Sequence, residues 1–148
     1  MSDQVILRVG VKVVIPLILP FALYVQFHGD YGPGGGFQAG VMFAAGLVLY
    51  GLVFGLDEVE RVVPRSVIRI CAPVGVLLFA GTGIVSLLKG GVFLDYDVLR
   101  HDAHHGQHLG ILLVELGVLI TVFSVLLGIF YMFADRGRFA GRADEDST

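Results

Sequence analysis

One acidic residue, Glu115, lies inside a long apolar segment and is the residue best placed in the sequence to do chemistry. It stands near the seventh position of a 25-residue apolar stretch. An ionisable side chain within such a stretch is costly to bury and is functional by default. A carboxyl group there can exchange a proton or hold a cation. The alternative is a protonated, structural glutamic acid that hydrogen-bonds to a neighbouring helix.

Four histidines precede Glu115 at spacings of three, four and seven residues, which place them near one stripe of a helix. They are His101, His104, His105 and His108. Because imidazoles titrate near neutral pH and a buried carboxyl can be tuned to do so, the set is a candidate proton path. About 10.5 Å of helix separates His108 from Glu115, so water would have to bridge them. The histidines are alternatively interfacial caps or zinc ligands. The HEXXH motif is absent, and we assign no metal site.

A second unusual segment is the glycine-rich stretch between the first two apolar segments, HGDYGPGGGFQAG. His28 and Asp30 are its titratable residues and further candidates for an ion or proton path. Its candidate structural residues are Pro33, Gly34, Gly35, Gly36, Phe37 and Gly40. Such a backbone turns tightly. It exposes N–H groups at the positive end of the next helix and carbonyls that can hold a cation. The alternative is a plain interhelical turn that lets another backbone approach.

The elements that must position these residues are four apolar segments of about 20 residues each. Hydrophobic residues make up 55% of the 148-residue chain, charged residues 16%, and the mean hydropathy is +0.82. Each segment is long enough to cross a ~30 Å hydrocarbon core, where backbone groups must bond internally as a helix. We therefore predict an all-α membrane protein. The expected helices are about 9–27, 37–56, 67–88 and 109–133 within a membrane domain of residues 1–134, followed by a polar tail at 135–148 that we expect to be disordered.

The flanking basic residues predict how the chain is oriented in the membrane. Eight of them fall on the side that would hold both termini and the middle loop, and two fall on the other side. The larger set is Arg8, Lys12, Arg61, Arg65, Arg69, Arg136, Arg138 and Arg142, and the smaller set is Lys89 and Arg100. This asymmetry places both termini in the cytoplasm. The net charge of −3, without basic stripes, indicates no nucleic-acid partner.

Many of the 21 glycines recur at helix-packing spacing, as in Gly36 and Gly40. Small residues let helices approach closely in lipid. Because four thin helices enclose little interior, we expect several glycine faces to meet other subunits. Packing within the chain is the alternative. Gly117 and Gly110, close to Glu115, would let another helix come near the carboxyl group.

Two motifs resemble those of a known family, the B subunits of the multi-subunit Mrp (Mnh) cation/proton antiporters. The first is the PGGGF sequence of residues 33–37, which follows His28 and precedes a Gly- and Ala-rich segment. The second is VELGV at residues 114–118, which resembles the family's acidic-x-Gly-Val signature. The family's acid is often Asp, whereas here it is Glu115. The length and the four-helix layout also agree, so the resemblance covers nearly the whole chain.

The resemblance implies a multi-pass subunit of the bacterial inner membrane that assembles with other Mrp subunits and exchanges Na⁺ for protons. It implies a secondary transporter subunit that shapes or lines an ion path, with no cofactor, and not an enzyme. The histidines from His101 to His108 are not part of the family motif. Two other interpretations stay open. One is a purely structural packing subunit of an antiporter or of a hydrogenase-like or complex I-like membrane complex. The other is a membrane metalloenzyme that uses the histidines.

Overall fold

The protein is all-helical in the part of the chain that the structure describes. The computed structural model describes all residues except 1, 30–31, 98–102 and 146–148, and for residues 2–4, 103–105 and 138–145 it describes the backbone alone. Its helices are α1 (Ser2–His28), α2 (Gly36–Phe54), α3 (Leu56–Val62), α4 (Arg65–Leu88) and α5 (Ala103–Glu145). Four of them are long and apolar enough to span a membrane, which confirms the four predicted spans.

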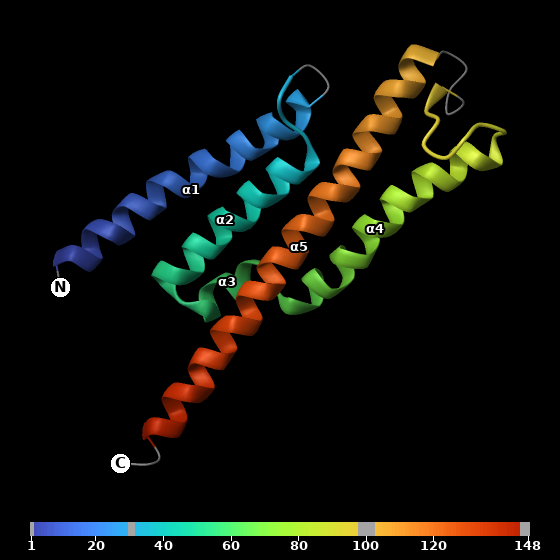
Figure 1. Ribbon diagram of the computed structural model, residues 1–148. Coiled ribbons are helices and arrows are strands. Elements are labelled where there is room, and N and C mark those ends of the chain that lie inside the picture. The colour runs from blue at the N-terminus through green and yellow to red at the C-terminus, as the bar shows by residue number, and fades with distance from the viewer. Residues whose placement is uncertain (1, 30–31, 98–102, 146–148) are drawn as a thin grey trace.

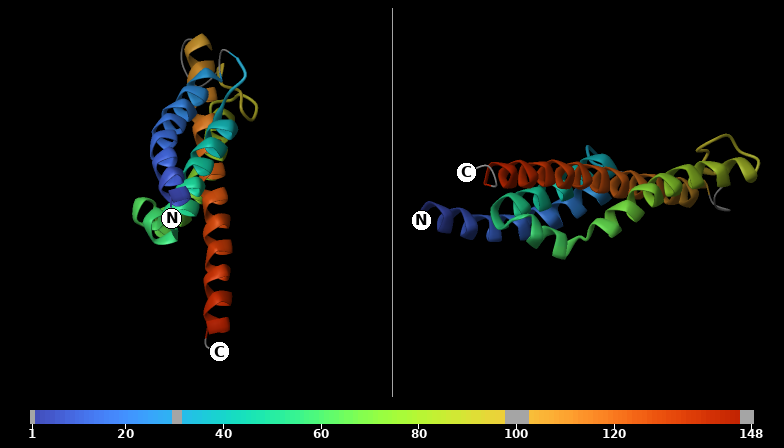
Figure 2. Two further views of the ribbon diagram at one scale, coloured as in Figure 1. Left: turned by 90° about the vertical axis from the view of Figure 1, so that its left-hand side faces the viewer. Right: turned by 90° about the horizontal axis from the view of Figure 1, so that it is seen from below.

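The four long helices lie side by side in one row, in the order α1, α2, α5, α4 (Figure 1). The main contacts are between α4 and α5, α2 and α5, and α1 and α2, whereas α1 touches α5 only slightly. Both termini and α3 lie at one end of the row, and the glycine-rich turn and the α4–α5 connection lie at the other (Figure 2). This row leaves much of each helix uncovered. For example, Phe21 and Leu17 of α1 remain exposed.

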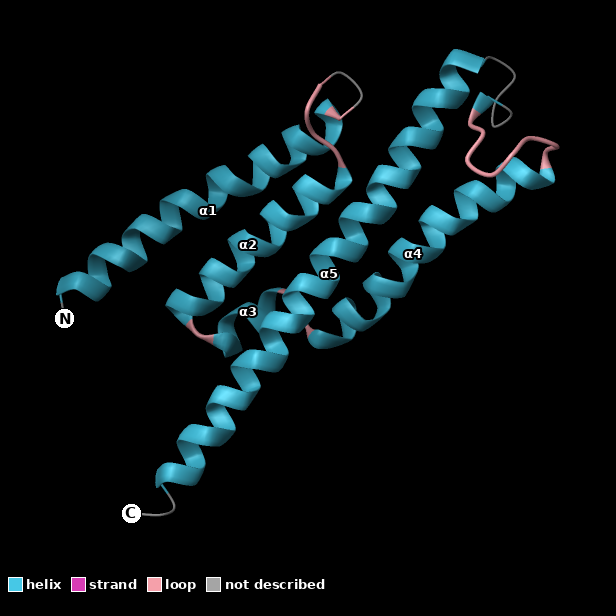
Figure 3. Cartoon of the chain, in the orientation of Figure 1, coloured by secondary structure: helices cyan, strands magenta, loops and turns pink. Residues whose placement is uncertain are grey.

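The short helix α3 was not predicted, because the apolar run of residues 37–56 conceals a break. Gly55 ends α2 with a φ of 102°, a conformation that favours glycine. α3 then turns across the end of the row (Figure 3). Its Leu56 and Val59 are buried in the hydrophobic core together with Leu127 and Tyr131. α3 therefore closes the core at the end where the termini lie.

The last helix is longer than the apolar pattern indicated. α5 begins at Ala103, six residues before the expected start, and continues to Glu145. The polar segment after Ala134, expected to be disordered, is thus helical as far as Glu145. This part of α5 projects beyond the other helices (Figures 1 and 2).

Several glycines pack within the chain, as in the alternative interpretation, and the expected glycine faces toward other subunits stay a prediction. A Cβ atom placed on Gly40 of α2 would lie 2.9 Å from the carbonyl oxygen of Leu119 in α5. One placed on Gly117 of α5 would lie 2.8 Å from the carbonyl oxygen of Gly75 in α4. These approaches bring α2 and α4 close to α5 around residues 117–119. Gly81, by contrast, has nothing within 4 Å of the same position.

Candidate functional site

The glycine-rich turn folds back on the end of α1 before α2 begins. The N–H of Gly32 donates to the carbonyl of His28 at 3.1 Å, and the N–H of Gly35 donates to the carbonyl of Val25 at 3.1 Å. Gly35 has a φ of 115°, so an L side chain there would be strained. Gly34 passes so close to α1 that a Cβ atom on it would lie 2.7 Å from the Val25 carbonyl oxygen. The tight turn expected from the glycines is therefore present.

The turn packs directly on Glu115, so that Gly29, Gly35 and Gly36 form a glycine seat for this residue. A Cβ atom on Gly35 would lie 2.7 Å from Glu115 Oε1, and one on Gly29 would collide with the same oxygen. At Gly36 the backbone is so close to the Glu115 carbonyl that a Cβ atom would overlap it. The structure thus brings together two motifs about 80 residues apart in the sequence.

The Glu115 carboxyl group lies beside the N-terminus of α2, and this neighbour contributes to its electrostatic environment. Gly35 is the N-cap residue of α2, it supplies no side-chain cap, and the first turn contains no acidic residue. The first N–H groups of a helix lack partners within the helix, and its N-terminus carries a partial positive charge. Glu115, from α5, places a carboxyl oxygen beside this N-terminus while its side chain is half-buried. The carboxyl group of Glu115 is therefore next to a partial positive charge.

Sequence reasoning missed Gln26, a buried polar residue of α1. It is 2% exposed, and neither its amide oxygen nor its amide nitrogen has a hydrogen-bond partner among the described residues. An amide buried in this way is costly unless something supplies the missing hydrogen bonds. The available signal was the spacing of Ala22, Gln26 and Gly29, which puts one polar and two small residues on a single face of α1.

The helix registers place Gln26 level with Glu115. α1 and α2 run antiparallel: Gly35 bonds to Val25, and a Cβ atom on Gly46 would lie 3.5 Å from side-chain carbons of both Ile18 and Leu19. This register sets Gln26 opposite the first turn of α2. α2 and α5 run in the same direction (Figure 1), and Gly36 meets Glu115.

Gln26, Gly36 and Glu115 therefore share one level of the row. Gly29, three residues after Gln26 and just past the end of α1, lies against the Glu115 carboxyl group. Two polar side chains, Gln26 of α1 and Glu115 of α5, thus lie at the level of the glycine turn.

Other predicted residues of the turn lie around this site. The half-buried His28 stacks on Tyr24 with ring centroids 5.2 Å apart. Pro33 and Phe37 line a shallow hollow of about 390 Å³ beside α1 and α2. Asp30 lies outside the described residues.

The predicted histidine stripe is only partly described. His104, His105 and His108 fall in the first turns of α5, as expected for a helix that starts early. His108 is exposed, the side chains of His104 and His105 are not described, and His101 lies outside the described residues. Among described residues there is no group of three side chains suited to hold a metal ion. The histidine path remains a prediction.

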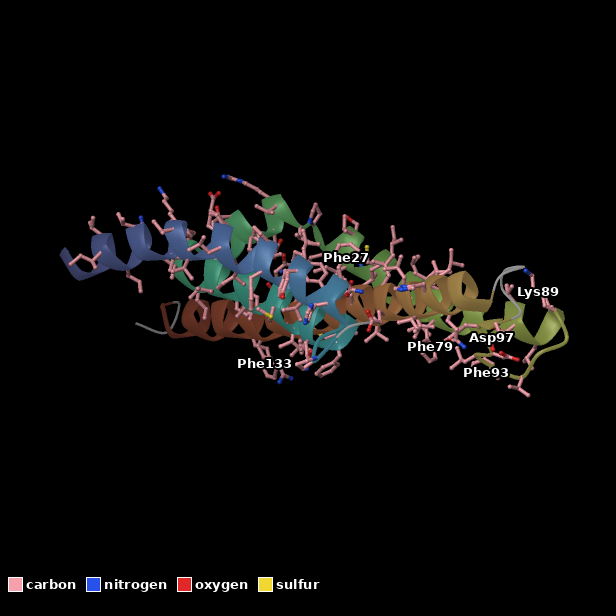
Figure 4. All side chains as sticks on the ribbon, turned by 90° about the horizontal axis from the view of Figure 1, so that it is seen from above. Phe27, Phe79, Lys89, Phe93, Asp97 and Phe133 are labelled. Carbon is pink, nitrogen blue, oxygen red and sulfur yellow. The ribbon has the colours of Figure 1, made fainter. Side chains whose placement is uncertain are left out.

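The α4–α5 connection folds back onto the helices and uses glycines that we had assigned to helix packing. Tyr96 covers Gly110 so closely that a Cβ atom there would collide with its ring, and Phe93 covers Gly83 in the same way. Gln107 donates to Asp97 at 2.7 Å. Phe93 and Asp97 lie together beside Lys89 at this end of the row (Figure 4). Burial raises the pKa of the Tyr96 phenol, which therefore stays neutral around pH 7.

The sequence is similar to one protein family and to relatives that share the same name. Residues 6–128 match the family model described as "Domain related to MnhB subunit of Na+/H+ antiporter". A Staphylococcus aureus (strain Newman) protein named "Putative antiporter subunit mnhB2" is 35% identical over 129 residues, which cover 85% of this chain and 91% of that protein. A Staphylococcus haemolyticus protein of the same name is 35% identical over 137 residues, which cover 86% of this chain and 96% of that protein.

Proposed function

The chain belongs to the MnhB family of Na⁺/H⁺ antiporter subunits, and from this premise we propose that it contributes a titratable site to the exchange of a monovalent cation, Na⁺, for protons. The observation that carries the proposal is the position of Glu115 in the glycine seat, level with the unpartnered amide of Gln26. Other Mrp antiporter subunits are its partners, and H⁺ and Na⁺ are the ions it handles.

The chemistry follows from competition for one carboxyl group. The N-terminus of α2 favours the carboxylate, whereas burial in an apolar row favours the protonated acid. Two opposing effects of this kind allow Glu115 to change protonation state when a cation or a proton arrives. The Gln26 amide offers one acceptor and two donors. Its oxygen can ligate a cation or accept from the protonated acid, and its nitrogen can donate to the carboxylate.

The residues at the same end of the row form the proposed route to this site. His28 borders the turn and is followed in the sequence by Asp30, while His108, with the sequence positions of His101, His104 and His105, leads toward Glu115. We propose that water links these groups, since about 10.5 Å of helix separates His108 from Glu115.

We also propose that the termini and α3 face the cytoplasm of a bacterial cell and that the glycine turn faces outward, because the basic residues cluster at the α3 end. Labelling intact cells with an impermeant thiol reagent tests this orientation in a Cys71→Ser background. Val92→Cys, exposed in the α4–α5 connection, should react, and Asp57→Cys, exposed on α3, should not. The reverse pattern would invert the topology.

A second candidate function rests on a specific observation. Glu115 stands where a helix cap would stand for α2, so it can serve as a purely structural partner of the turn in a packing subunit. Such a subunit would support assembly and handle no ion.

Glu115→Gln separates the two functions, because it keeps the volume and some hydrogen bonds but removes titration. We expect the complex to assemble, while Na⁺-driven proton movement in everted vesicles falls by on the order of 100-fold or shifts its pH profile, as for loss of a positioned proton-transfer group. Glu115→Asp should retain partial exchange. The matched control is Glu58→Gln, which removes an exposed α3 carboxylate paired with Arg61. Wild-type rate and pH dependence in Glu115→Gln would leave only the packing function.

A further inference from the structure

Two neighbouring apolar hollows lie along α5 at the end of the row that carries the termini, and the larger one lies between α4 and α5. One hollow of about 630 Å³ is lined by Ile68, Ala72, Gly128, Ile129 and Met132, among others. A second hollow of about 330 Å³ lies beyond it and shares Ile129 and Met132 with the first. The first hollow alone has the volume of a typical small-ligand site. We call the two hollows together the basic groove, because arginines stand at its rim.

Three arginines line the basic groove, and they differ in how they are bound. Arg65 is held by Glu60 and by Asp135, to which it donates at 2.7 Å through Nη2. Arg69 lines the first hollow, Arg136 lines the second, and both are exposed. No described residue forms a hydrogen bond or ion pair with Arg69 or Arg136. The rim therefore carries two guanidinium groups, one from α4 and one from α5, that could bind an anion and have no partner among the described residues.

The position of the rim along the helices matches the level of lipid headgroups. The apolar span of α4 begins at Arg65, and that of α5 ends at Gly137. Charged groups at span ends lie at the polar boundary of a ~30 Å hydrocarbon core. The groove floor, lined by Ile68 and Ile129, extends from this boundary toward the membrane interior. An apolar floor below and a cationic rim above fit a molecule with an acyl chain and an anionic head.

We propose that the basic groove binds one anionic phospholipid, with its phosphate between Arg69 and Arg136 and an acyl chain over Ile68 and Ile129. Guanidinium groups suit phosphate because their planar donors form paired, charge-assisted hydrogen bonds. Basic pockets between membrane helices bind anionic headgroups in this way. The headgroup of a zwitterionic lipid carries a cation of its own, which the guanidinium groups of Arg69 and Arg136 would repel. The bound lipid links α4 to α5 where α5 leaves the row, and the inference is independent of Glu115.

The test is photocrosslinking in membranes that contain the assembled complex. The two probes are phosphatidylglycerol and phosphatidylcholine, each with a photoreactive acyl chain, and adducts are mapped by mass spectrometry to residues 124–136. We expect the phosphatidylglycerol probe to label this segment more strongly. Arg69→Gln should lower that labelling by about fivefold, because one arginine near a membrane surface contributes roughly that factor to the binding of anionic lipid. It should leave phosphatidylcholine labelling unchanged.

Two further variants separate a built site from general surface charge. Arg61→Gln removes an α3 arginine outside the groove and should change nothing. Gly128→Leu should reduce labelling by both probes, since it fills the groove floor. A Cβ atom at Gly128 makes only ordinary contact, 3.4 Å from Ile68, so the variant is expected to fold.

Three results would each overturn the proposal. One is equal labelling by the two probes, and another is an equal loss in Arg61→Gln and Arg69→Gln. The third is absence of lipid adducts together with crosslinks from this segment to another subunit, which would make the groove a protein interface.

Discussion

The two ends of the helix row differ in how most of their polar groups are bound. At the α3 end, Arg65 is bound by two carboxylates, and the Tyr131 hydroxyl donates to the carbonyl of Val63 at 2.8 Å. At the glycine-turn end, bare backbone surrounds the Glu115 carboxyl group, and the Gln26 amide has no described partner. Satisfied polar groups stabilise a fold, whereas a buried group without a partner is a cost that a ligand can offset. The difference supports our proposal that the ion site lies at the turn end, whereas the contacts at the α3 end hold the fold together.

The largest effect is expected where the turn meets α5. Gly36→Ala places a methyl group on the Glu115 carbonyl, and Gly35→Val adds strain at a positive φ. Because both contacts involve backbone or a confined carboxyl group, they are hard to relieve. We expect the chain to be lost from the purified complex, with exchange abolished. Gly81→Ala, which meets nothing within 4 Å, is the matched control and should assemble normally. Normal exchange in both turn variants would make the turn a dispensable linker.

The next largest effect is expected for Gln26, whose substitution should lower ion exchange without lowering stability, the reverse of what is expected at the α3 end. Gln26→Leu removes an amide without described partners and keeps a similar volume, so stability should be unchanged or higher. Exchange per assembled complex should nevertheless fall several-fold, as for loss of a positioned polar group in a transfer step. Thermal stability and vesicle exchange are measured together. Ser124→Ala is the matched control, because the buried Ser124 hydroxyl also lacks a described partner but lies away from the turn. Unaltered exchange in Gln26→Leu would remove Gln26 from the site.

A smaller effect is expected at Arg65, where the substitution should lower stability and leave ion exchange unchanged. Arg65→Gln leaves Glu60 and Asp135 without the cation that joins α5 to the corner of α3 and α4. The guanidinium is partly exposed, so the loss should be about 1–2 kcal/mol of unfolding free energy, between a surface pair and a buried one. Exchange by the assembled complex should not change. Arg61→Gln, which breaks only an exposed pair within α3, should cost under about 0.5 kcal/mol. A changed pH profile in Arg65→Gln would contradict the division between the two ends.

The smallest effect is expected for Tyr131→Phe, which removes one hydroxyl from the core at the α3 end. The variant loses the hydrogen bond to the Val63 carbonyl and should destabilise the chain by about 1 kcal/mol. Urea unfolding in detergent measures it. The half-buried Tyr50, for which no hydroxyl bond is seen among described residues, serves as control through Tyr50→Phe. Equal losses in the two variants would mean that ring packing, and not the hydrogen bond, holds this corner.

The sequence predicted the spans well and the site only in part. Apolar length alone identifies four spans, because lipid imposes that length on each helix. The glycines of the turn and the acid of α5 each stood out locally, yet their contact joins residues far apart in the chain, which no local pattern specifies. Gln26 was missed because a single amide near a helix end resembles an interfacial residue. α3 was missed because Leu56 extends the apolar run past the break at Gly55.

α5 is a single unbroken helix that carries Glu115 near one end of the row and Asp135 at the other. The two residues are 20 positions apart, or about 30 Å along the helix axis. A helix resists stretching, so an axial shift at the glycine seat reaches the Asp135–Arg65 contact undiminished. α5 is thus one rigid element that joins the glycine seat to the Asp135–Arg65 contact at the other end of the row.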